Sequence, residues 1–204
     1  MSDLDDKPPP DPLLDERYIE ALAFTVKLHA RQARKGTRIP YLAHLLEVSG
    51  LVLEDGGTED EAIAALLHDA VEDQGGQKTL SGIREKFGDE VARVVEACSD
   101  TDRQPKPPWL ERKREYLTHL EDADPSTLRV SCADKLHNVR SIVADQAHHG
   151  DDVWERFSAS PPETVWYYES LSEIFSRRLP DSMLTKQLQK AVSELAAAAS
   201  TAPR

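Results

Sequence analysis

Two adjacent pairs of polar residues, four positions apart, are the residues of this sequence best suited to chemistry. His68-Asp69 and Glu72-Asp73 follow an apolar run at residues 62–67. Because residues four apart on a helix lie on one face, His68 is expected beneath Glu72, and Asp69 beneath Asp73. Burial of an imidazole and carboxylates without a partner is costly, and a cation compensates for it. The pattern indicates a hydrolytic metal site.

The alternative is a solvated acidic helix end, because Gln74-Gly75-Gly76 follows and is typical of a helix stop. For Glu72 and Asp73 alone this alternative is the better interpretation. The presence of His68-Asp69 one turn earlier favours the metal site.

Further metal ligands are expected on other apolar helical segments. His44 lies among apolar residues just after Pro40, which suits a first helical turn. Asp134 lies in a second such segment, at residues 128–140. Alone, a buried histidine is more often a satisfied core residue, and a helical aspartate more often pairs with a cation such as Lys135 or Arg140. Only the complete set favours a metal site.

The set formed by His44, His68-Asp69 and Asp134 resembles the signature of the HD phosphohydrolase superfamily. Three longer segments, at residues 34–44, 66–73 and 133–140, are similar to the hydrolase half of the RelA/SpoT alarmone enzymes, and the similarity spans about residues 17–178. Three positions differ from that pattern without removing a predicted ligand or catalytic carboxylate: Ala33, Leu45 and Gln74.

The resemblance implies an all-α fold, a compact multi-helix HD-domain bundle with the metal site in its centre. It also implies a role for ten residues. The implied metal ligands are His44, His68, Asp69 and Asp134. The implied catalytic residues are Glu72 and Asp73, and the implied substrate-binding residues are Arg34, Lys35, Asn138 and Ser141.

A mixed set of imidazole and carboxylate ligands favours a borderline or hard divalent ion over a closed thiolate site. The family expectation is Mn²⁺, with Fe²⁺, Zn²⁺ or another divalent metal as alternatives. Cys98 and Cys132 lack metal-ligand spacing and are expected to be buried small hydrophobic residues.

The net charge of the chain limits the classes of molecule that it is expected to bind. With 25 basic and 37 acidic residues the net charge is −12, which opposes non-specific binding of nucleic acid. A nucleotide then needs a local basic pocket, and a cluster supplies one: Arg31, Arg34, Lys35 and Arg38. The alternative, a basic helix end, is equally good for Arg31 and Arg38. Neither a secretory leader nor a membrane-spanning run is present in the sequence, so a cytoplasmic location is expected.

The chain is expected to divide into a disordered N-terminal arm (1–14), an HD-type hydrolase domain (15–180) and a C-terminal helix with a frayed end (181–204). Thr58 and Glu61 have the form of a capping box, and Asp89 is expected to cap a helix. Residues 103–108 are expected to form a loop, with helices resuming near Trp109 and after Pro125. Tyr167 or Tyr168 is expected to face the pocket.

The predicted function is that of a stand-alone small alarmone hydrolase. Its reaction is the metal-dependent removal of the 3′-pyrophosphate from ppGpp or pppGpp, which releases GDP or GTP and pyrophosphate. The alternatives are an HD phosphohydrolase that removes a ribose 2′- or 3′-phosphate from another nucleotide (NADPH included), a low-turnover nucleotide sensor, and a helical partner-binding domain. The sequence favours neither a monomer nor a dimer.

Overall fold

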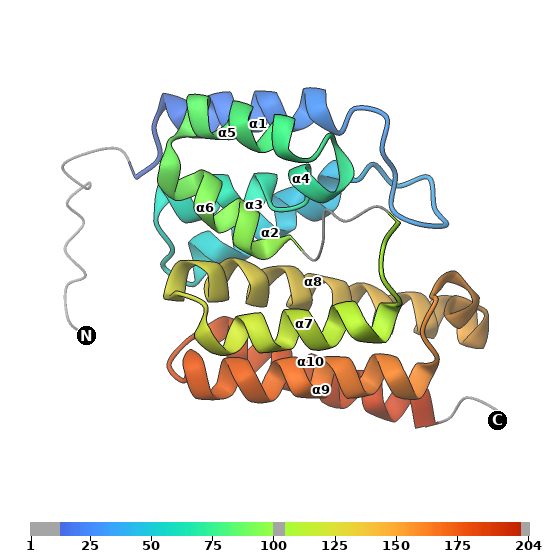
Figure 1. Ribbon diagram of the computed structural model, residues 1–204. Helices are drawn as coiled ribbons and strands as arrows, with labels where there is room; N and C mark the ends of the chain where they lie inside the picture. The colour runs from blue at the N-terminus through green and yellow to red at the C-terminus, as the bar shows by residue number, and fades with distance from the viewer. Residues whose placement is uncertain (1–12, 100–104, 201–204) are drawn as a thin grey trace, which may run out of the picture.

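The computed structural model describes residues 13–99 and 105–200, and over these residues the chain is helical without a strand (Figure 1). The predicted all-α fold is confirmed. The helices are α1 (Glu16–Leu28), α2 (Leu42–Glu54), α3 (Glu59–Leu67), α4 (Ala70–Asp73), α5 (Gln77–Phe87), α6 (Asp89–Cys98), α7 (Trp109–Asp122), α8 (Pro125–His149), the 3-10 helix η1 (Gly150–Arg156), α9 (Pro161–Arg178) and α10 (Met183–Ser200).

Some predictions fall outside the described residues. These are most of the predicted N-terminal arm, the first part of the loop at 103–108 and the last four residues of the predicted frayed end. The predicted helix starts near Trp109 and after Pro125 are confirmed by α7 and α8.

Helix α3 is the centre of the fold. Its residues 62–67 are all 0% exposed, and the helix contacts α1, α2, α6 and α8. A helix that is apolar on every side is stable only when it is surrounded in this way. The predicted capping box begins α3, because Thr58 and Glu61 each bond the other's backbone N–H. This central helix delivers His68 at its carboxyl end.

The helix is interrupted at the functional doublet, where the sequence pattern suggests a continuous one. Helix α3 ends at Leu67, and the backbone of Asp69 (φ −93°, ψ 0°) separates it from the single turn of α4. The predicted stop after Asp73 is confirmed, since Gly75 and Gly76 adopt φ of +113° and +61°. Glycine reaches this region without the steric cost that other residues meet.

Helix α8 is the longest helix and carries Asp134 near its middle. It begins with Pro125 at the first helical position, and the Asp124 side chain accepts hydrogen bonds from the backbone N–H groups of Ser126 and Thr127. The prediction that Asp89 caps a helix is wrong. Asp89 is the first residue of α6, and the cap is Gly88, whose φ of +94° a non-glycine residue rarely adopts.

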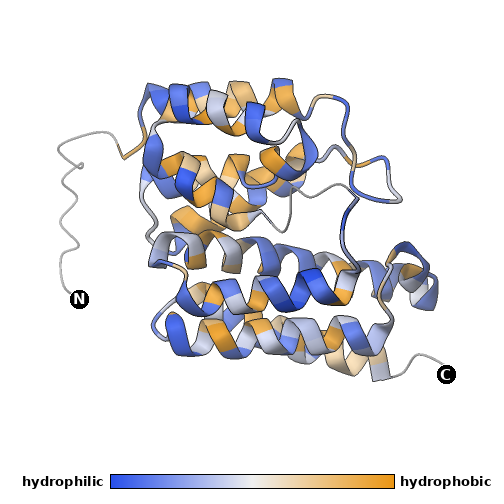
Figure 2. Ribbon diagram, viewed as in Figure 1, coloured by the Kyte–Doolittle hydropathy of each residue, from blue (hydrophilic) through white to orange (hydrophobic). Residues whose placement is uncertain are grey.

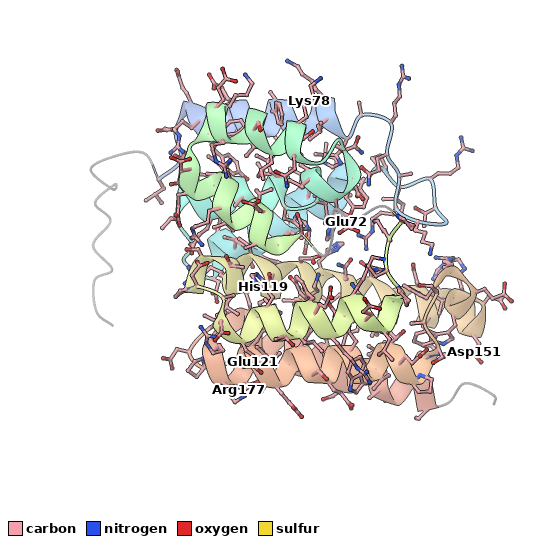
Figure 3. All side chains as sticks on the ribbon, viewed as in Figure 1. Glu72, Lys78, His119, Glu121, Asp151 and Arg177 are labelled. Carbon is pink, nitrogen blue, oxygen red and sulfur yellow. The ribbon has the colours of Figure 1, made fainter. Side chains whose placement is uncertain are left out.

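In Figure 1, helices α7, α9 and α10 form a second layer below the layer that contains α1 to α6. Helix α10 packs against α8 and α9, and Arg177 of α9 pairs with Glu121 of α7 at 2.7 Å (Figure 3). The visible side of α7 is largely polar in Figure 2, and this helix buries only Tyr116 and Leu120. Helix α8 contacts both layers. None of the described helices has the length and apolar character needed to cross a membrane.

Candidate metal centre

Four side-chain atoms from three parts of the chain meet beside the carboxyl end of α3. His68 Nε2 lies 3.0 Å from Asp69 Oδ2 and 3.6 Å from Asp134 Oδ1. His44 Nε2, from α2, lies 3.5 Å and 3.3 Å from the same two oxygens. The structure therefore brings together all four residues that the sequence predicts as metal ligands, and we call them the four-residue cluster.

The two histidines of the cluster present nitrogens that suit a cation. Both Nε2 atoms are buried, and neither has a hydrogen-bond partner among the described residues. Buried polar atoms are normally satisfied, so such a pair requires an explanation. His68 Nδ1 lies 2.8 Å from the carbonyl oxygen of Ala65, which can only accept, so Nδ1 carries a proton and Nε2 is the nitrogen that can bind a cation. Burial opposes a charged ring, but Asp69 and Asp134 raise the pKa of His68 well above its usual range, so a cation at Nε2 would take the place of a proton.

His44 is oriented by a histidine that the sequence analysis missed. Its Nδ1 lies 2.8 Å from Nδ1 of His137, so one ring must donate and the other accept. Burial, together with His44 and the guanidinium of Arg34, lowers the pKa of His137 to about 4, which keeps that ring neutral at neutral pH. His137 can then accept from His44, whose Nε2 is left free to bind a cation. The available signal was spacing, because His137 follows Asp134 by three positions on one helix.

Asp134 is buried (6% exposed) and paired with two neighbours on α8. Lys135 Nζ lies 2.5 Å from one carboxylate oxygen, and Asn138 Nδ2 donates to the other across 2.5 Å. Burial alone would raise the pKa of Asp134. The ammonium of Lys135 and the two histidines outweigh burial and hold that pKa well below its usual range. The salt bridge that served as the alternative interpretation of Asp134 is therefore present alongside the cluster, whereas Arg140 donates to Gln187 of α10.

Asp69 is the more exposed carboxylate of the cluster, and the hydroxyl of Tyr41 donates to its Oδ2. Burial opposes ionisation of Asp69, but the nearby rings of His68 and His44 lower its pKa well below the usual range. Two carboxylates and the Nε2 atoms of two imidazole rings thus face one another. This donor set fits a divalent metal ion, with a preference for borderline or hard ions. Cys98 and Cys132 are free, buried and outside the cluster, as predicted.

The predicted catalytic carboxylates lie on α4, next to the cluster in the chain but with partners of their own. Glu72 extends toward the segment that leads into α7, where Lys106 Nζ lies 2.7 Å from its Oε1 (Figure 3). Asp73 Oδ2 accepts a hydrogen bond of 2.7 Å from Gln32 Nε2. Burial, Asp69 and Glu72 raise the pKa of Asp73, and the bond from Gln32 opposes that rise. Of the two polar pairs, only His68-Asp69 joins the cluster.

A cavity of about 460 Å³ opens beside His44. The four predicted substrate-binding residues all line it: Arg34, Lys35, Asn138 and Ser141. Arg34 Nη2 donates to Asn138 Oδ1 across 3.1 Å, which joins the loop after α1 to helix α8. Tyr168 also lines this cavity, whereas Tyr167 lines a smaller neighbouring cavity of about 200 Å³. Neither Arg31 nor Arg38 is among the lining residues.

The family model of the HD domain matches residues 21–163 of the chain. The chain belongs to the HD domain family.

Relatives of this HD domain include two proteins named guanosine-3′,5′-bis(diphosphate) 3′-pyrophosphohydrolase MESH1. The one from Xenopus tropicalis is 37% identical over 127 residues, which is 61% of this chain and 68% of that protein. The one from Homo sapiens is 36% identical over 129 residues, or 62% of this chain and 69% of that protein.

Two solved structures share the fold of this HD domain. A metazoan SpoT orthologue that hydrolyses ppGpp has a TM-score of 0.73 at 21% identity, covering 91% of this chain and 98% of that one. A Listeria monocytogenes protein has a TM-score of 0.64 at 27% identity, covering 74% of this chain and 96% of that one.

Proposed function

We propose that this HD domain is a metal-dependent (p)ppGpp 3′-pyrophosphohydrolase that releases GDP or GTP and pyrophosphate. The observation that carries the proposal is the pair of buried, unpartnered histidine nitrogens facing two carboxylates at the edge of a cavity with basic and amide side chains. The names of the MESH1 relatives and the activity of the SpoT orthologue support the choice of substrate.

We propose Mn²⁺ as the ion, held by His44, His68, Asp69 and Asp134. Two imidazole and two carboxylate ligands suit manganese, and iron or zinc are the alternatives. When bound, such an ion supplies Lewis acidity that lowers the pKa of water and polarises a phosphoryl oxygen.

Asp73 is the proposed general base and Glu72 the proposed group that assists the leaving oxygen. In the reaction, a water oxygen bonds to the phosphorus attached to the 3′ oxygen, and the bond between that phosphorus and the 3′ oxygen breaks. The water proton passes to Asp73, which later returns it to solvent, and the 3′ oxygen of the nucleoside takes up a proton that Glu72 passes on from solvent water. A carboxylate whose pKa is raised by burial and neighbouring carboxylates is a stronger base than one in water, which suits Asp73 to this role.

The substrate-binding role is proposed for the four predicted residues that line the cavity: Arg34, Lys35, Asn138 and Ser141. The net charge of −12 opposes binding of long polyanions, while the cations of the cavity favour a small phosphorylated ligand. A small guanine nucleotide is therefore the proposed partner, and nucleic acid is not. We propose a cytoplasmic location, with residues 15–180 as the hydrolase unit and 181–204 as an added C-terminal helix.

The test is product release by manganese-loaded protein from ppGpp, pppGpp, NADPH and simple nucleotides, with Asp69→Ala as the blank. We expect GDP and pyrophosphate from ppGpp with the wild type and neither from the blank. Turnover of NADPH and of no other nucleotide would show that the substrate is NADPH rather than ppGpp, and the metal-dependent mechanism would stand. A protein that binds ppGpp without releasing any product would be a sensor, and the hydrolase proposal would fail.

A further inference from the structure

A set of amide hydrogen bonds leads from the end of α1 to Asp73. Gln32 lies between α1 and α2, and its Nε2 donates to Asp73 Oδ2 across 2.7 Å. Gln32 Oε1 lies 2.6 Å from His29 Nδ1 and accepts a bond of 2.6 Å from Gln74 Nε2. One glutamine amide therefore links the proposed general base, Asp73, to two further residues, His29 and Gln74.

The chemistry of the partners allows one arrangement of protons in this set. An ionised carboxylate only accepts hydrogen bonds, so Gln32 must turn its NH₂ group toward Asp73 and its oxygen toward His29. Because an amide oxygen also only accepts, the proton of His29 must lie on Nδ1. In this arrangement each of the three bonds to the Gln32 amide joins a donor to an acceptor.

The backbone of Gln32 is held as firmly as its side chain. Its N–H donates to the carbonyl of His29 across 3.0 Å, and its own carbonyl accepts from the N–H of Tyr41 across 2.9 Å. The ring of His29, which is 3% exposed, stacks on the ring of Tyr41 with centroids 5.7 Å apart. Tyr41 in turn donates to Asp69 of the four-residue cluster. One segment thus fixes both Asp69 and Asp73.

The bond from Gln32 also acts on the charge of Asp73. Burial raises the pKa of this carboxyl, and the charges of Asp69 and Glu72 raise it further. Gln32 donates to the ionised form and so opposes that rise. Its bond occupies Oδ2 and leaves Oδ1 to accept from a water proton.

We propose that Gln32 is a positioning residue that orients Asp73 for proton transfer, with His29 and Gln74 fixing the Gln32 amide. The inference rests on the proposed function, in which Asp73 is the base. Gln32 itself need not touch the substrate, because it acts through Asp73.

The test compares the manganese-loaded wild type, over all 204 residues, with Gln32→Met, which keeps the length of the side chain and removes both the oxygen and the NH₂ group of the amide. We expect kcat to fall by roughly 10- to 100-fold, a part of what a complete general base contributes. We expect KM to stay within about twofold and the bound metal to remain stoichiometric, because no proposed metal ligand or cavity-lining residue changes. The acidic limb of the kcat profile should move to higher pH, since the ionised base has lost a donor.

Gln189→Met is the matched control. Gln189 on α10 also donates an amide hydrogen bond, to Ser176 on α9, and it does not line the cavity beside His44. Gln74→Met is a milder variant, because it removes one of the two donors to Gln32 and leaves the bond to Asp73 in place. We expect a smaller loss of kcat than in Gln32→Met.

A second measurement needs no substrate. In zinc-loaded protein, the carbon-13 resonance of the Asp73 carboxyl should titrate at higher pH in Gln32→Met than in the wild type or Gln189→Met. An unchanged titration, or an unchanged kcat with active wild type, overturns the positioning role and leaves the proposed function standing. A wild type that turns over no nucleotide overturns both proposals.

Discussion

Removal of one carboxylate from the four-residue cluster should abolish the stabilisation of the folded chain by a bound metal ion. The cluster exists only in the folded chain, because its members come from α2, the α3–α4 junction and α8. An ion that binds only the folded state stabilises it by about 2.7 kcal/mol when its free concentration is roughly 100 times its dissociation constant. In a chain of 204 residues, each kcal/mol of added stability raises Tm by about 2–4 °C. Saturating Mn²⁺ should therefore raise Tm by roughly 5–11 °C relative to the protein in EDTA.

Asp134→Asn is the informative variant. It keeps the shape of the side chain and removes the charge that faces His44 Nε2 at 3.3 Å. It also leaves the ammonium of Lys135 buried beside a neutral amide, so we expect the variant to be less stable than the wild type without metal. With Mn²⁺, its Tm should rise by less than about 2 °C, in the range that weak surface binding of the ion produces.

The assay is thermal unfolding followed by circular dichroism, with manganese, iron and zinc each titrated against chelator-treated protein. Asp122→Asn, at the end of α7, is the charge-matched control and should show the full wild-type rise. An equal rise in Asp134→Asn and in the wild type would refute the reasoning, since the ion would then bind elsewhere. The absence of a rise with all three ions would refute it as well.

Three further predictions concern rate, affinity and acid stability. Glu72→Gln should retain bound metal but lose roughly 100-fold or more in kcat, and full activity of this variant would exclude its role in protonating the leaving oxygen. Arg34→Gln should raise KM for ppGpp several-fold with kcat nearly unchanged, as measured by steady-state kinetics, and an unchanged KM would count against the proposed nucleotide pocket. Burial alone would raise the pKa of Asp124, but bonds from Arg93 and Thr127 hold it well below its usual range, so its stabilising effect is complete above about pH 4 and is lost as pH falls toward the folded-state pKa. Asp124→Ala should therefore lower the free energy of unfolding in urea by about 1 kcal/mol at pH 7, because the cap of α8 is lost. The difference from the wild type should shrink near pH 2. An equal difference at both pH values would show that the ionised Asp124 carboxylate is not its source.

The sequence predicts the helical fold and the His68-Asp69 doublet because their signals are local, whereas His44 and Asp134 are assigned to the cluster by the resemblance to the HD superfamily. The doublet His68-Asp69 is adjacent in the chain, and the apolar run before it marks a buried helix whichever elements surround it. Thr58 and Glu61 lie three positions apart, so their capping box can also be recognised from the sequence alone.

The parts that the sequence does not predict depend on contacts between distant segments. Gln32 meets Asp73 across 41 positions, and His44 meets His137 across 93. The spacing of His137 from Asp134 places both on one helix, but no spacing links His137 to His44 or Gln32 to Asp73, because packing between distant segments creates these contacts. The break between α3 and α4 at Asp69 was not predicted either. The periodicity of apolar residues does not show where a buried helix ends because of its contacts with other segments.

The position of Asp134 in the chain sets the stage of folding at which the four-residue cluster can form. The other three members of the cluster are synthesised by residue 69, but the fourth arrives only with α8, whose helix runs to His149. Since ligands brought together by folding do not form a site in an unfolded chain, the cluster is complete only after α8 has packed against α2 and α3. A divalent ion that needs all four side chains would therefore bind after these helices have docked, and a folding intermediate without α8 would lack the fourth ligand.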